Sequence, residues 1–447
     1  MPSSSTVVSA PMPPSEAARR WLLLAVATLQ QAGLTFVRFG LPTVAPFIRA
    51  DLGLSLTQTG VVLGAFDLGA LVAFYATGVA TDRFGERRVM ALGAWFTGLL
   101  AAASAAAPGM RELAIVLALA GAGFPSSQVA GSHAVMGWFH ARERGVAMGV
   151  RQAGLPLGGL AGALVLPWVA ASAGWRLAMV VAGAGCILAG LATFLALPDG
   201  EPAAHSGAVA RPGLPLHREP SPVRALPAGG FLQAPRQFLR DRALVATTLM
   251  ACLLAASQFS LTGYLPLYMV DVFRWDRQAA SRLLLVVHAG GIAGRLLWGW
   301  VSDRRFHGDR VAPLVTVSLS GALGAALIAA LALAPLPPAA VAGSALLAGL
   351  TLLGWNGLYI TLISELSGPA SAVMLGISMT VLYVWTMLSP PGFGWLVERL
   401  GSYPAAWTAL VAIQLMAAVA ATAAGSFAPA RRAGAPHRLR PRVGGGR

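Results

Sequence analysis

Two long apolar runs flank the stretch Gly78-Val-Ala-Thr-Asp82-Arg83-Phe-Gly85-Glu-Arg87-Arg88. Another pair of apolar runs flanks a similar stretch, Gly299-Trp-Val-Ser-Asp303-Arg304-Arg305. The two aspartates are 303 − 82 = 221 residues apart. Two further pairs repeat this interval closely: Glu143 with Glu365 (365 − 143 = 222) and Pro42 with Pro266 (266 − 42 = 224). An offset near half the chain length predicts that the two halves are copies of one fold.

The composition places these halves in a membrane. Of the 447 residues, 56% are hydrophobic and only 11% are charged, whereas soluble domains carry about 25% charged residues. A crossing helix needs about 20 apolar residues. About twelve such runs are expected, at 21–47, 57–80, 89–107, 111–137, 145–171, 176–197, 242–270, 277–300, 312–334, 338–362, 370–396 and 404–427. We predict an all-α polytopic membrane protein with twelve transmembrane helices in two pseudo-symmetric six-helix bundles. This architecture is usual in secondary transporters, whose substrate site lies between the halves.

The remaining sequence divides into tails and a linker. Residues 1–18 are rich in Ser, Pro and Ala, and residues 428–447 alternate Arg with Gly and Pro, so both are expected to be disordered. Residues 198–240 are rich in Pro, Gly and Arg, a composition that breaks helices and suits a linker. The expected domains are an N-terminal bundle over 19–197 and a C-terminal bundle over 241–427.

The net charge of +15 follows membrane sidedness rather than a nucleic-acid surface. All 32 basic residues are arginines; fourteen lie in loops after even-numbered helices and six in loops after odd-numbered helices. Because basic loop residues favour the cytoplasm, both termini and the linker are predicted to be cytoplasmic, in a bacterial-type inner membrane. The expected partners are the lipid bilayer, a small organic anion, and a proton or exchanged anion. No nucleic acid is expected, and the protein is expected to be a monomer.

The first stretch resembles the loop motif of the major facilitator superfamily, G-x-x-x-D-R-x-G-x-R-R, and the second resembles a degenerate copy of it. The resemblance covers residues 20–427. It implies a cytoplasmic latch that holds the halves together while the transporter faces outward. Carried over by position, one latch comprises Asp82, Arg83, Gly85, Arg87 and Glu143, and the other comprises Asp303, Arg304 and Glu365. The second copy departs from the motif at Phe306-His307, where the glycine is displaced to Gly308.

Both copies of the motif begin with a glycine and contain an aspartate four residues later. Gly78 and Gly299 carry no side chain, so they are expected to let a neighbouring helix approach closely. The aspartates can accept hydrogen bonds from the amides at the start of a facing helix. The alternative interpretation is that the motif is only a folding and topology signal.

Four arginines fall inside the expected helices, although an arginine at a helix centre costs about 2.5–3.5 kcal/mol on insertion scales. Arg282 lies near a helix end, where it can reach the interface. Arg38, Arg151 and Arg295 lie deeper. In the facilitator fold the helices that carry Arg151 and Arg295 pack together, so the resemblance implies that their side chains converge. Two guanidinium groups favour an anion, because each can bind a carboxylate through two hydrogen bonds.

A second resemblance, to monocarboxylate and oxalate–formate carriers, rests on Gly294-Arg295-Leu-Leu-Trp-Gly299. It implies that Arg295 contacts the substrate carboxylate. The structural alternative is an ion pair of Arg295 with Asp303 or Glu365, and an ion pair for Arg151 as well. The other candidate binding residues lie beside Arg151 or on helices that line the cavity in this fold: Gln152, Gln258, Tyr264, Trp355, Asn356 and Tyr359.

A proton-coupled carrier also needs a titratable group in its path. Asp67 lies deep in its helix, where an unpaired carboxylate costs free energy. An ion pair with Arg38 is therefore the structural alternative to a role of Asp67 in proton coupling. His133 and His288 titrate near neutral pH when unperturbed. Either histidine can instead be a hydrogen-bonded packing residue.

These features favour a proton-coupled carrier of a small organic anion, a mono- or dicarboxylate. A drug–proton antiporter is the alternative, because Gly154-Leu155-Pro156-Leu157-Gly158-Gly159 nearly matches a motif of those exporters. The same run also suits close helix packing. A receptor without transport activity is a remote alternative. No enzyme, cofactor or metal site is predicted, since the sequence shows neither a phosphate-binding glycine loop nor a His/Cys cluster with metal-ligand spacing.

Overall fold

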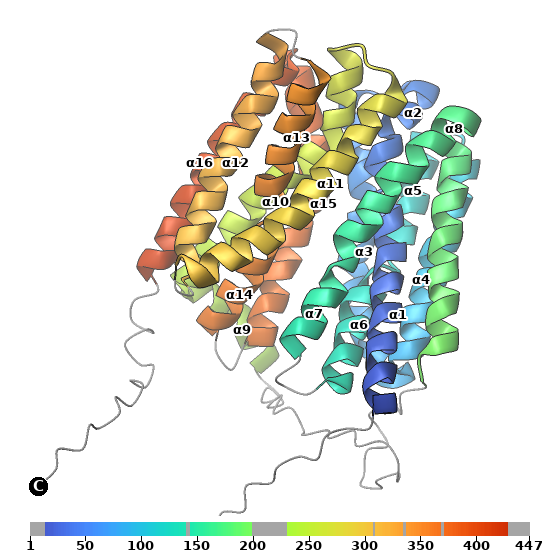
Figure 1. Cartoon of the computed structure of the whole chain (residues 1–447), viewed down its shortest axis with the longest axis vertical. Helices are drawn as coiled ribbons and strands as arrows, with labels where there is room; N and C mark the ends of the chain where they lie inside the picture. The colour runs from blue at the N-terminus through green and yellow to red at the C-terminus, as the bar shows by residue number, and fades with distance from the viewer. Residues whose placement is uncertain are drawn as a thin grey trace, which may run out of the picture.

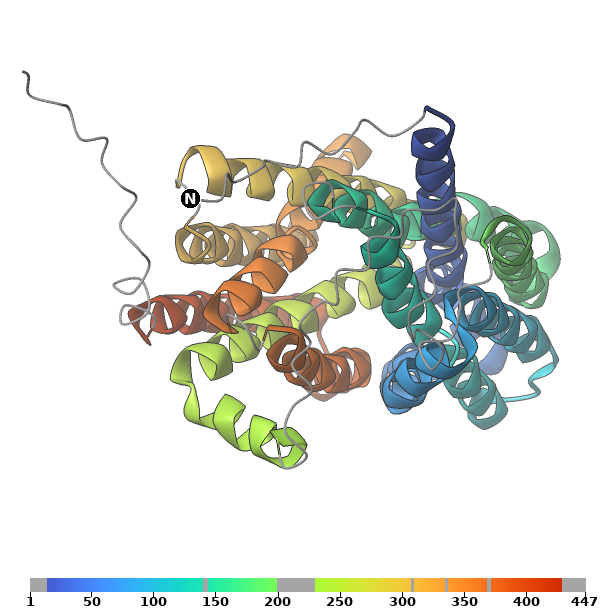
Figure 2. The ribbon, with the colours of Figure 1, turned by 90° about the horizontal axis from the view of Figure 1, so that it is seen from below.

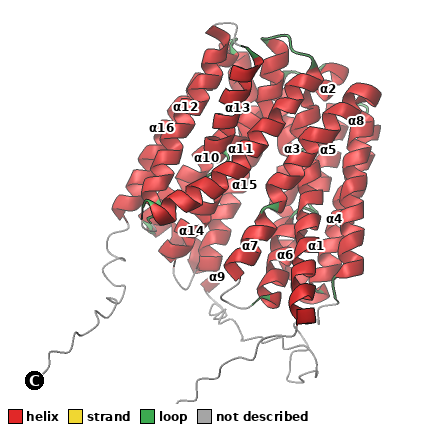
Figure 3. Ribbon diagram, in the orientation of Figure 1, coloured by secondary structure: helices red, strands yellow, loops and turns green. Residues whose placement is uncertain are grey.

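The computed structural model describes residues 14–139, 144–198, 230–306, 309–333, 337–367 and 371–427. Within these ranges the regular elements are all helices, and there is no strand (Figure 3). The predicted all-α fold is therefore confirmed.

Each half of the chain forms its own series of helices. The first half contains α1 (Pro14–Arg38), α2 (Leu41–Leu52), α3 (Leu56–Phe84), α4 (Glu86–Ala103), η1 (Ser104–Ala106), α5 (Met110–Gly121), α6 (Pro125–Trp138), α7 (Arg144–Gln152) and α8 (Gly154–Ala196). The second contains α9 (Gly230–Arg240), α10 (Arg242–Asp271), α11 (Arg277–Arg304), α12 (Val311–Ala330), η3 (Leu331–Leu333), α13 (Pro338–Leu352), α14 (Asn356–Ser367), α15 (Ser371–Leu400) and α16 (Tyr403–Phe427).

Eleven stretches of the described residues are long and apolar enough to cross a membrane. One of them, Ala147–Ala196, has 50 residues, more than twice the roughly 20 that one crossing needs. Inside it α8 reverses direction at Gly174, whose φ of 86° and ψ of 159° lie outside the helical region. A positive φ of this size favours glycine, which has no Cβ. This stretch therefore crosses twice, and the fold is consistent with the twelve crossings predicted.

Four crossings in the described residues are interrupted where the sequence predicted single helices. The interruptions lie at 39–40, 122–124, 153 and 353–355. In the first two, a proline is the second or first residue of the next helix: Pro42 and Pro125 have no backbone N–H to donate to the carbonyls of Arg38 and Gly121. Interrupted helices leave backbone groups free inside the membrane, a feature of transporter binding sites.

The segment predicted to be a helix-free linker ends in a helix. Residues Gly230–Arg240 form α9, which packs against α10 and α15. Its side chain Phe238 is only 3% exposed and belongs to the core of the second half. The expectation that proline and glycine exclude helix from 198–240 is therefore wrong for its last eleven residues.

The two halves lie side by side (Figure 1), and seen from below they form two groups of helices (Figure 2). α1 begins and α16 ends at the same end of the molecule, called the inner end below; the opposite end is called the outer end. Across the boundary between the halves, α3 packs along α15, α8 along α11, and α2 against α10. α3 and α11 are a repeated pair, as are the first part of α8 and α15, so the contact of α3 with α15 is repeated by the contact of α11 with α8.

Glycines bring α3 and α15 into close contact. A Cβ added at Gly60 or Gly64 would overlap with backbone atoms of Pro390 or Met387 on α15. By contrast, a Cβ added at Gly78 or Gly299 has no atom within 4 Å. The prediction that Gly78 and Gly299 permit close helix contact is wrong for this conformation, because the tight contacts of α3 lie nearer its outer end.

Candidate substrate site and gates

A buried ion pair lies near the interruption of the first crossing. The Nε of Arg38 donates to Oδ1 of Asp67 at 2.7 Å, and the two side chains are 8% and 4% exposed. This is the ion pair given above as the structural alternative to a proton-coupling role for Asp67. Burial of an unpaired charge costs free energy, and the ion pair lowers this cost for both residues inside the membrane.

Four aromatic rings surround the Arg38 guanidinium. The rings of Phe39 and Phe124 in the first half lie 5.1 and 4.9 Å from its Cζ. Those of Phe259 and Tyr383 in the second half lie 5.2 and 5.4 Å away. Aromatic faces attract cations, so Arg38 binds aromatic groups of both halves at once.

His288 lies beside this cluster on α11. Its side chain is 3% exposed, and its ring centroid is 5.9 Å from that of Phe39. Its Nε2 is buried and has no hydrogen-bond partner among the described residues. A Cβ added at Gly159 of α8 would come within 2.8 Å of the imidazole. His288 follows Asp67 by 288 − 67 = 221 residues. The two titratable groups therefore occupy equivalent positions in the two halves, both at the interface.

Arg295 lies two turns further along α11 and reaches the interruption between α13 and α14. Its Nε donates to the carbonyl oxygen of Leu353 at 3.3 Å. Among the described residues it has no acidic partner, so the expected ion pair with Asp303 or Glu365 does not form. Arg295 is half-buried and retains donor groups that are not engaged by the protein. A guanidinium in this state can bind an anion.

Amide and aromatic side chains line the same interruption. Oε1 of Gln258 on α10 accepts hydrogen bonds from Nε1 of Trp355 at 3.1 Å and from Nδ2 of Asn356 at 3.3 Å. The Trp355 ring packs at 5.7 Å from that of Tyr359, whose hydroxyl bonds to Ser378 at 2.6 Å. Four of the predicted binding residues thus lie together around one broken helix, which Arg295 also contacts.

Arg151 is held inside the first half. Its side chain is fully buried; Nη1 donates to Oε1 of Gln31 at 2.6 Å, and Nη2 donates to Oγ of Ser132 at 2.7 Å and to the Ser127 carbonyl at 3.0 Å. Gln31 also donates to Gln152 at 3.0 Å. The expected ion pair is again absent among the described residues. These bonds tie α7 to α1 and α6, and the structure gives no contact of Arg151 with Arg295.

The other predicted polar residues lie away from this cluster. Nδ1 of His133 lies 2.6 Å from Oε1 of Glu86, and the histidine side chain is 51% exposed. The glycine run from Gly154 packs α8 against α1: a Cβ at Gly154 would lie 2.6 Å from the Thr28 carbonyl oxygen, and one at Gly158 would overlap with Thr35. The packing interpretation of that run therefore matches the geometry.

Hydrogen bonds between the halves close the outer end. Nη1 of Arg49, at the end of α2, lies 2.7 and 2.6 Å from the two carboxylate oxygens of Asp271, at the end of α10. Tyr403 also donates to Asp271, at 2.7 Å. On the neighbouring pair of helices, the backbone N–H of Thr57 donates to Glu398 at 3.0 Å, and its hydroxyl bonds to the same carboxylate.

Tyr264 completes this closure, although the sequence analysis predicted a binding residue there. Its buried hydroxyl lies 2.8 Å from the Leu56 carbonyl oxygen and 2.7 Å from that of Pro390, so it can donate to either half. We call Arg49, Asp271, Thr57, Glu398 and Tyr264 the outer gate. The Arg49–Asp271 ion pair was not predicted, although the sequence holds a signal for it: the two residues are 222 positions apart, the interval of the other repeated residues.

At the inner end the second motif forms ion pairs within the second half, and a different arginine takes part from the one predicted. Nη1 of Arg310, rather than Arg304, lies 2.6 Å from Asp303, and Nε of Arg310 lies 3.3 Å from Glu365. Burial lowers the pKa of Arg310, but the bonds and attraction to these two carboxylates raise it above its ordinary value. Arg304 is exposed. Arg310 takes its place because α12 begins directly after it and carries it back towards α14.

The first motif is only partly described. Gly85 joins α3 to α4 with a φ of 81°, which requires a glycine. Arg87 donates to the carbonyl of Phe194 at 2.8 Å, within its own half, and Arg83 lies over the Phe84 ring. Glu143 and the side chain of Asp82 lie outside the part of the chain that the structure describes. The latch role of these residues stays a prediction.

Two repeated halves, interrupted crossings and buried charges at their interface define a membrane transport protein. The sequence model of the Major Facilitator Superfamily matches residues 27–390, and the chain belongs to this family.

Several curated proteins match part of the sequence. A hexuronate transporter of Bacillus subtilis is 33% identical over 107 residues, 24% of this chain and 25% of that protein. A probable L-galactonate transporter of Escherichia coli is 33% identical over 98 residues, 22% of each chain. An uncharacterized MFS-type transporter of Mycobacterium tuberculosis is 28% identical over 134 residues, 30% of each. The chain thus spans less than a third of the length of these relatives.

Solved structures match over nearly the whole chain. A bacterial homolog of the human lysosomal transporter Spinster has a TM-score of 0.71 at 17% identity, covering 94% of this chain and 98% of the other. A D-xylose–proton symporter has a TM-score of 0.69 at 16% identity, covering 92% and 98%. At these identities the likeness shows the fold alone.

Proposed function

We propose that this protein is a secondary carrier of small, hydroxylated organic anions of the sugar-acid class. The observation that carries the proposal is Arg295, a half-buried guanidinium inside the bundle with no acidic partner among the described residues. A carboxylate group supplies the missing negative charge and matches the guanidinium geometry with two parallel hydrogen bonds.

The surroundings of Arg295 suit the rest of such a molecule. Gln258 and Asn356 offer amide donors and acceptors at the interruption of α13 and α14, and Trp355 offers an apolar ring. Sugar hydroxyl groups both donate and accept hydrogen bonds, so amides bind them well. The partial matches to a hexuronate transporter and a probable L-galactonate transporter support this substrate class over simple monocarboxylates.

In this proposal Arg151 is a positioning residue. Its guanidinium is engaged by Gln31, Ser132 and backbone carbonyls and is fully buried, so it holds α7 in place instead of reaching the substrate. Asp67 and His288 are the candidate proton acceptors, because both are titratable groups at the interface of the halves. Inner-membrane location and cytoplasmic termini are part of the proposal and follow from the arginine distribution.

Uptake by proteoliposomes tests the proposal. We expect accumulation of D-glucuronate or a galactonate, but not of glucose, and faster uptake under an imposed proton gradient. Arg295→Gln removes a charge-assisted hydrogen bond worth about 1.5–3 kcal/mol, so the substrate affinity is expected to fall about 10- to 100-fold.

The matched control is Arg282→Gln, an exposed arginine at the outer end of the same helix, which is expected to retain uptake. Equal uptake by Arg295→Gln and the wild type would remove Arg295 from the binding site. Transport of glucose with no uptake of either acid would refute the anion class.

A further inference from the structure

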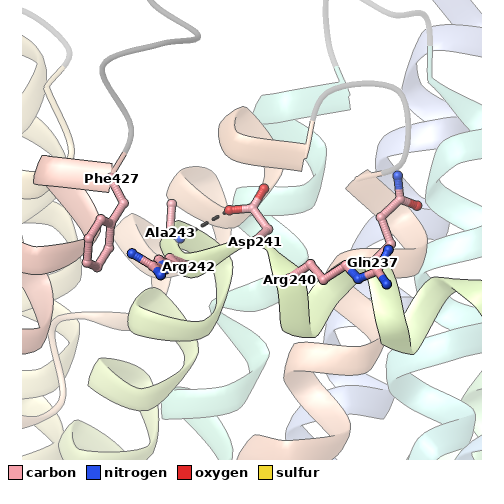
Figure 4. A pocket seen from close by; sticks show the side chains of 6 residues that line it. All are labelled: Gln237, Arg240, Asp241, Arg242, Ala243 and Phe427. Carbon is pink, nitrogen blue, oxygen red and sulfur yellow. Dashed lines mark hydrogen bonds between the residues drawn. The ribbon is translucent and has the colours of Figure 1, made fainter.

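A basic pocket lies at the inner end of the second half, apart from the interface between the halves. It has a volume of about 390 Å³ and is lined by Gln237, Arg240, Asp241, Arg242, Ala243 and Phe427 (Figure 4). These residues come from the end of α9, the start of α10 and the end of α16. Because α10 enters its membrane-spanning stretch at Arg242, the pocket lies at the level where lipid headgroups meet water.

Three arginines at or beside the pocket, Arg236, Arg240 and Arg242, form no ion pair within the part of the chain that the structure describes. Arg236 and Arg240 are four residues apart on α9, so they share one face of the helix, and such like-charged pairs repel. Arg242 follows directly, and its guanidinium lies 5.9 Å from the Phe427 ring. All three arginines are exposed. Asp241 lines the pocket but turns its carboxylate to the amides of Ala243 and Leu244, where it caps α10 (Figure 4).

Apolar side chains border the arginines. Leu239 is 71% exposed and Phe427 is 48% exposed, whereas Phe238, between Leu239 and the pocket-lining Gln237, is buried and anchors α9 to the bundle. Figure 2 shows α9 at the rim of the bundle. An amphipathic helix with arginines and exposed apolar residues at this depth is suited to lie in the membrane interface.

We propose that this pocket binds the phosphate headgroup of an anionic phospholipid, with Arg240 and Arg242 holding the phosphate and Leu239 and Phe427 contacting the start of the acyl chains. The planar guanidinium group can donate two parallel hydrogen bonds to two oxygens of a phosphate group. The cytoplasmic leaflet, to which the proposed topology assigns the inner end, is the anionic one. The site would tie α9 to the first and last crossings of the second half, and it does not depend on which substrate is carried.

Native mass spectrometry of the purified full-length chain with added lipid tests this site. The wild type is expected to retain phosphatidylglycerol in preference to phosphatidylcholine. The double variant Arg240→Gln/Arg242→Gln is expected to lose about tenfold in phosphatidylglycerol affinity, because it lacks both guanidinium groups of the pocket. Arg88→Gln/Arg305→Gln removes two exposed arginines outside the pocket, one in the first turn of α4 and one directly after α11, and is expected to keep the wild-type affinity.

Thermal unfolding in phosphatidylcholine verifies that both double variants fold, since all four side chains are exposed. An equal loss of phosphatidylglycerol affinity in the two double variants would overturn the proposal. Lipid binding would then depend on the overall positive charge of the inner surface and not on this pocket. Inorganic phosphate that displaces the lipid completely at millimolar concentration, or that stabilises the wild type as strongly as the lipid does, would identify a free-anion site instead.

Discussion

At the scale of single residues, three arginines in the membrane-spanning helices have three different sets of contacts. Arg38 is paired with Asp67, Arg151 is bound to neutral groups, and Arg295 is engaged through a single Nε bond. The local sequence does not predict which partner each arginine has, because each of the three lies in an apolar helix. The partner that the fold brings to each guanidinium decides whether it is structural or open to a ligand.

The Arg38–Asp67 pair provides a residue-scale prediction. Because both side chains are less than a tenth exposed, removing one partner leaves an uncompensated buried charge, at a cost of about 3–5 kcal/mol. Asp67→Asn and Arg38→Gln are each expected to lower the unfolding midpoint in detergent strongly. The double variant is expected to be more stable than the sum of the two losses implies.

A double-mutant cycle measures this coupling. Strictly additive losses would show that the pair does not stabilise the fold. Asp51→Asn/Arg176→Gln, which removes an exposed ion pair in the same half, is the control and is expected to change the midpoint little.

At the scale of elements, glycines determine how closely α3 approaches α15. Gly60, Gly64 and Gly78 all lie on α3, yet only the first two face a neighbouring backbone. Sequence spacing alone does not distinguish them, and the loop motif drew attention to Gly78 instead. The structure shows that the close approach occurs near the outer end, where Tyr264 and Thr57 also join the halves.

Two glycine substitutions on α3 are expected to act in opposite directions. Gly64→Ala places a Cβ on the Met387 carbonyl oxygen, and overpacking of this kind costs about 1–3 kcal/mol. Gly78→Ala meets no atom within 4 Å and replaces a poor helix former by a good one, which gains up to about 1 kcal/mol. Unfolding midpoints in detergent compare the two; a more stable Gly64→Ala protein would contradict the packing described.

At the scale of the whole molecule, hydrogen bonds and an ion pair close the outer end between the halves. In the proposed carrier, alternating access would require these contacts to break when the substrate site opens to that side. The Arg49–Asp271 pair is the strongest of them, since the arginine contacts both carboxylate oxygens and the side chains are only about a quarter exposed. The outer gate therefore sets part of the balance between the two conformations.

Asp271→Asn is expected to shift this balance towards an open outer end. The substitution weakens the bonds from Arg49 and Tyr403, which favour the closed state. Spin labels on cysteines introduced at Ser172 and Arg399, exposed at the outer ends of the two halves, report the separation, because native Cys186 and Cys252 are buried.

In the wild type a short distance is expected to dominate, and Asp271→Asn is expected to populate a longer one. Unchanged distances in Asp271→Asn would show that the ion pair does not hold the gate. Asp276→Asn, which changes a helix-capping carboxylate at the same end, is the control.

The sequence by itself determined the membrane class, the repeat and the number of crossings. Apolar run length and the interval of about 222 residues are properties of the chain that no tertiary contact can change. The sequence also identified which charged residues lie within apolar helices. Burying an arginine or aspartate there costs free energy wherever the helix packs.

Only the tertiary structure decided which partner each of those residues has. It paired Arg38 with Asp67, placed Arg310 instead of Arg304 beside Asp303 and Glu365, and joined the Tyr264 hydroxyl to carbonyl oxygens near the outer end. The physical reason is that hydrogen bonds and ion pairs act over a few ångströms between helices far apart in the sequence. Their partners depend on helix rotation and on the interruptions of the crossings, which the hydrophobic pattern does not encode.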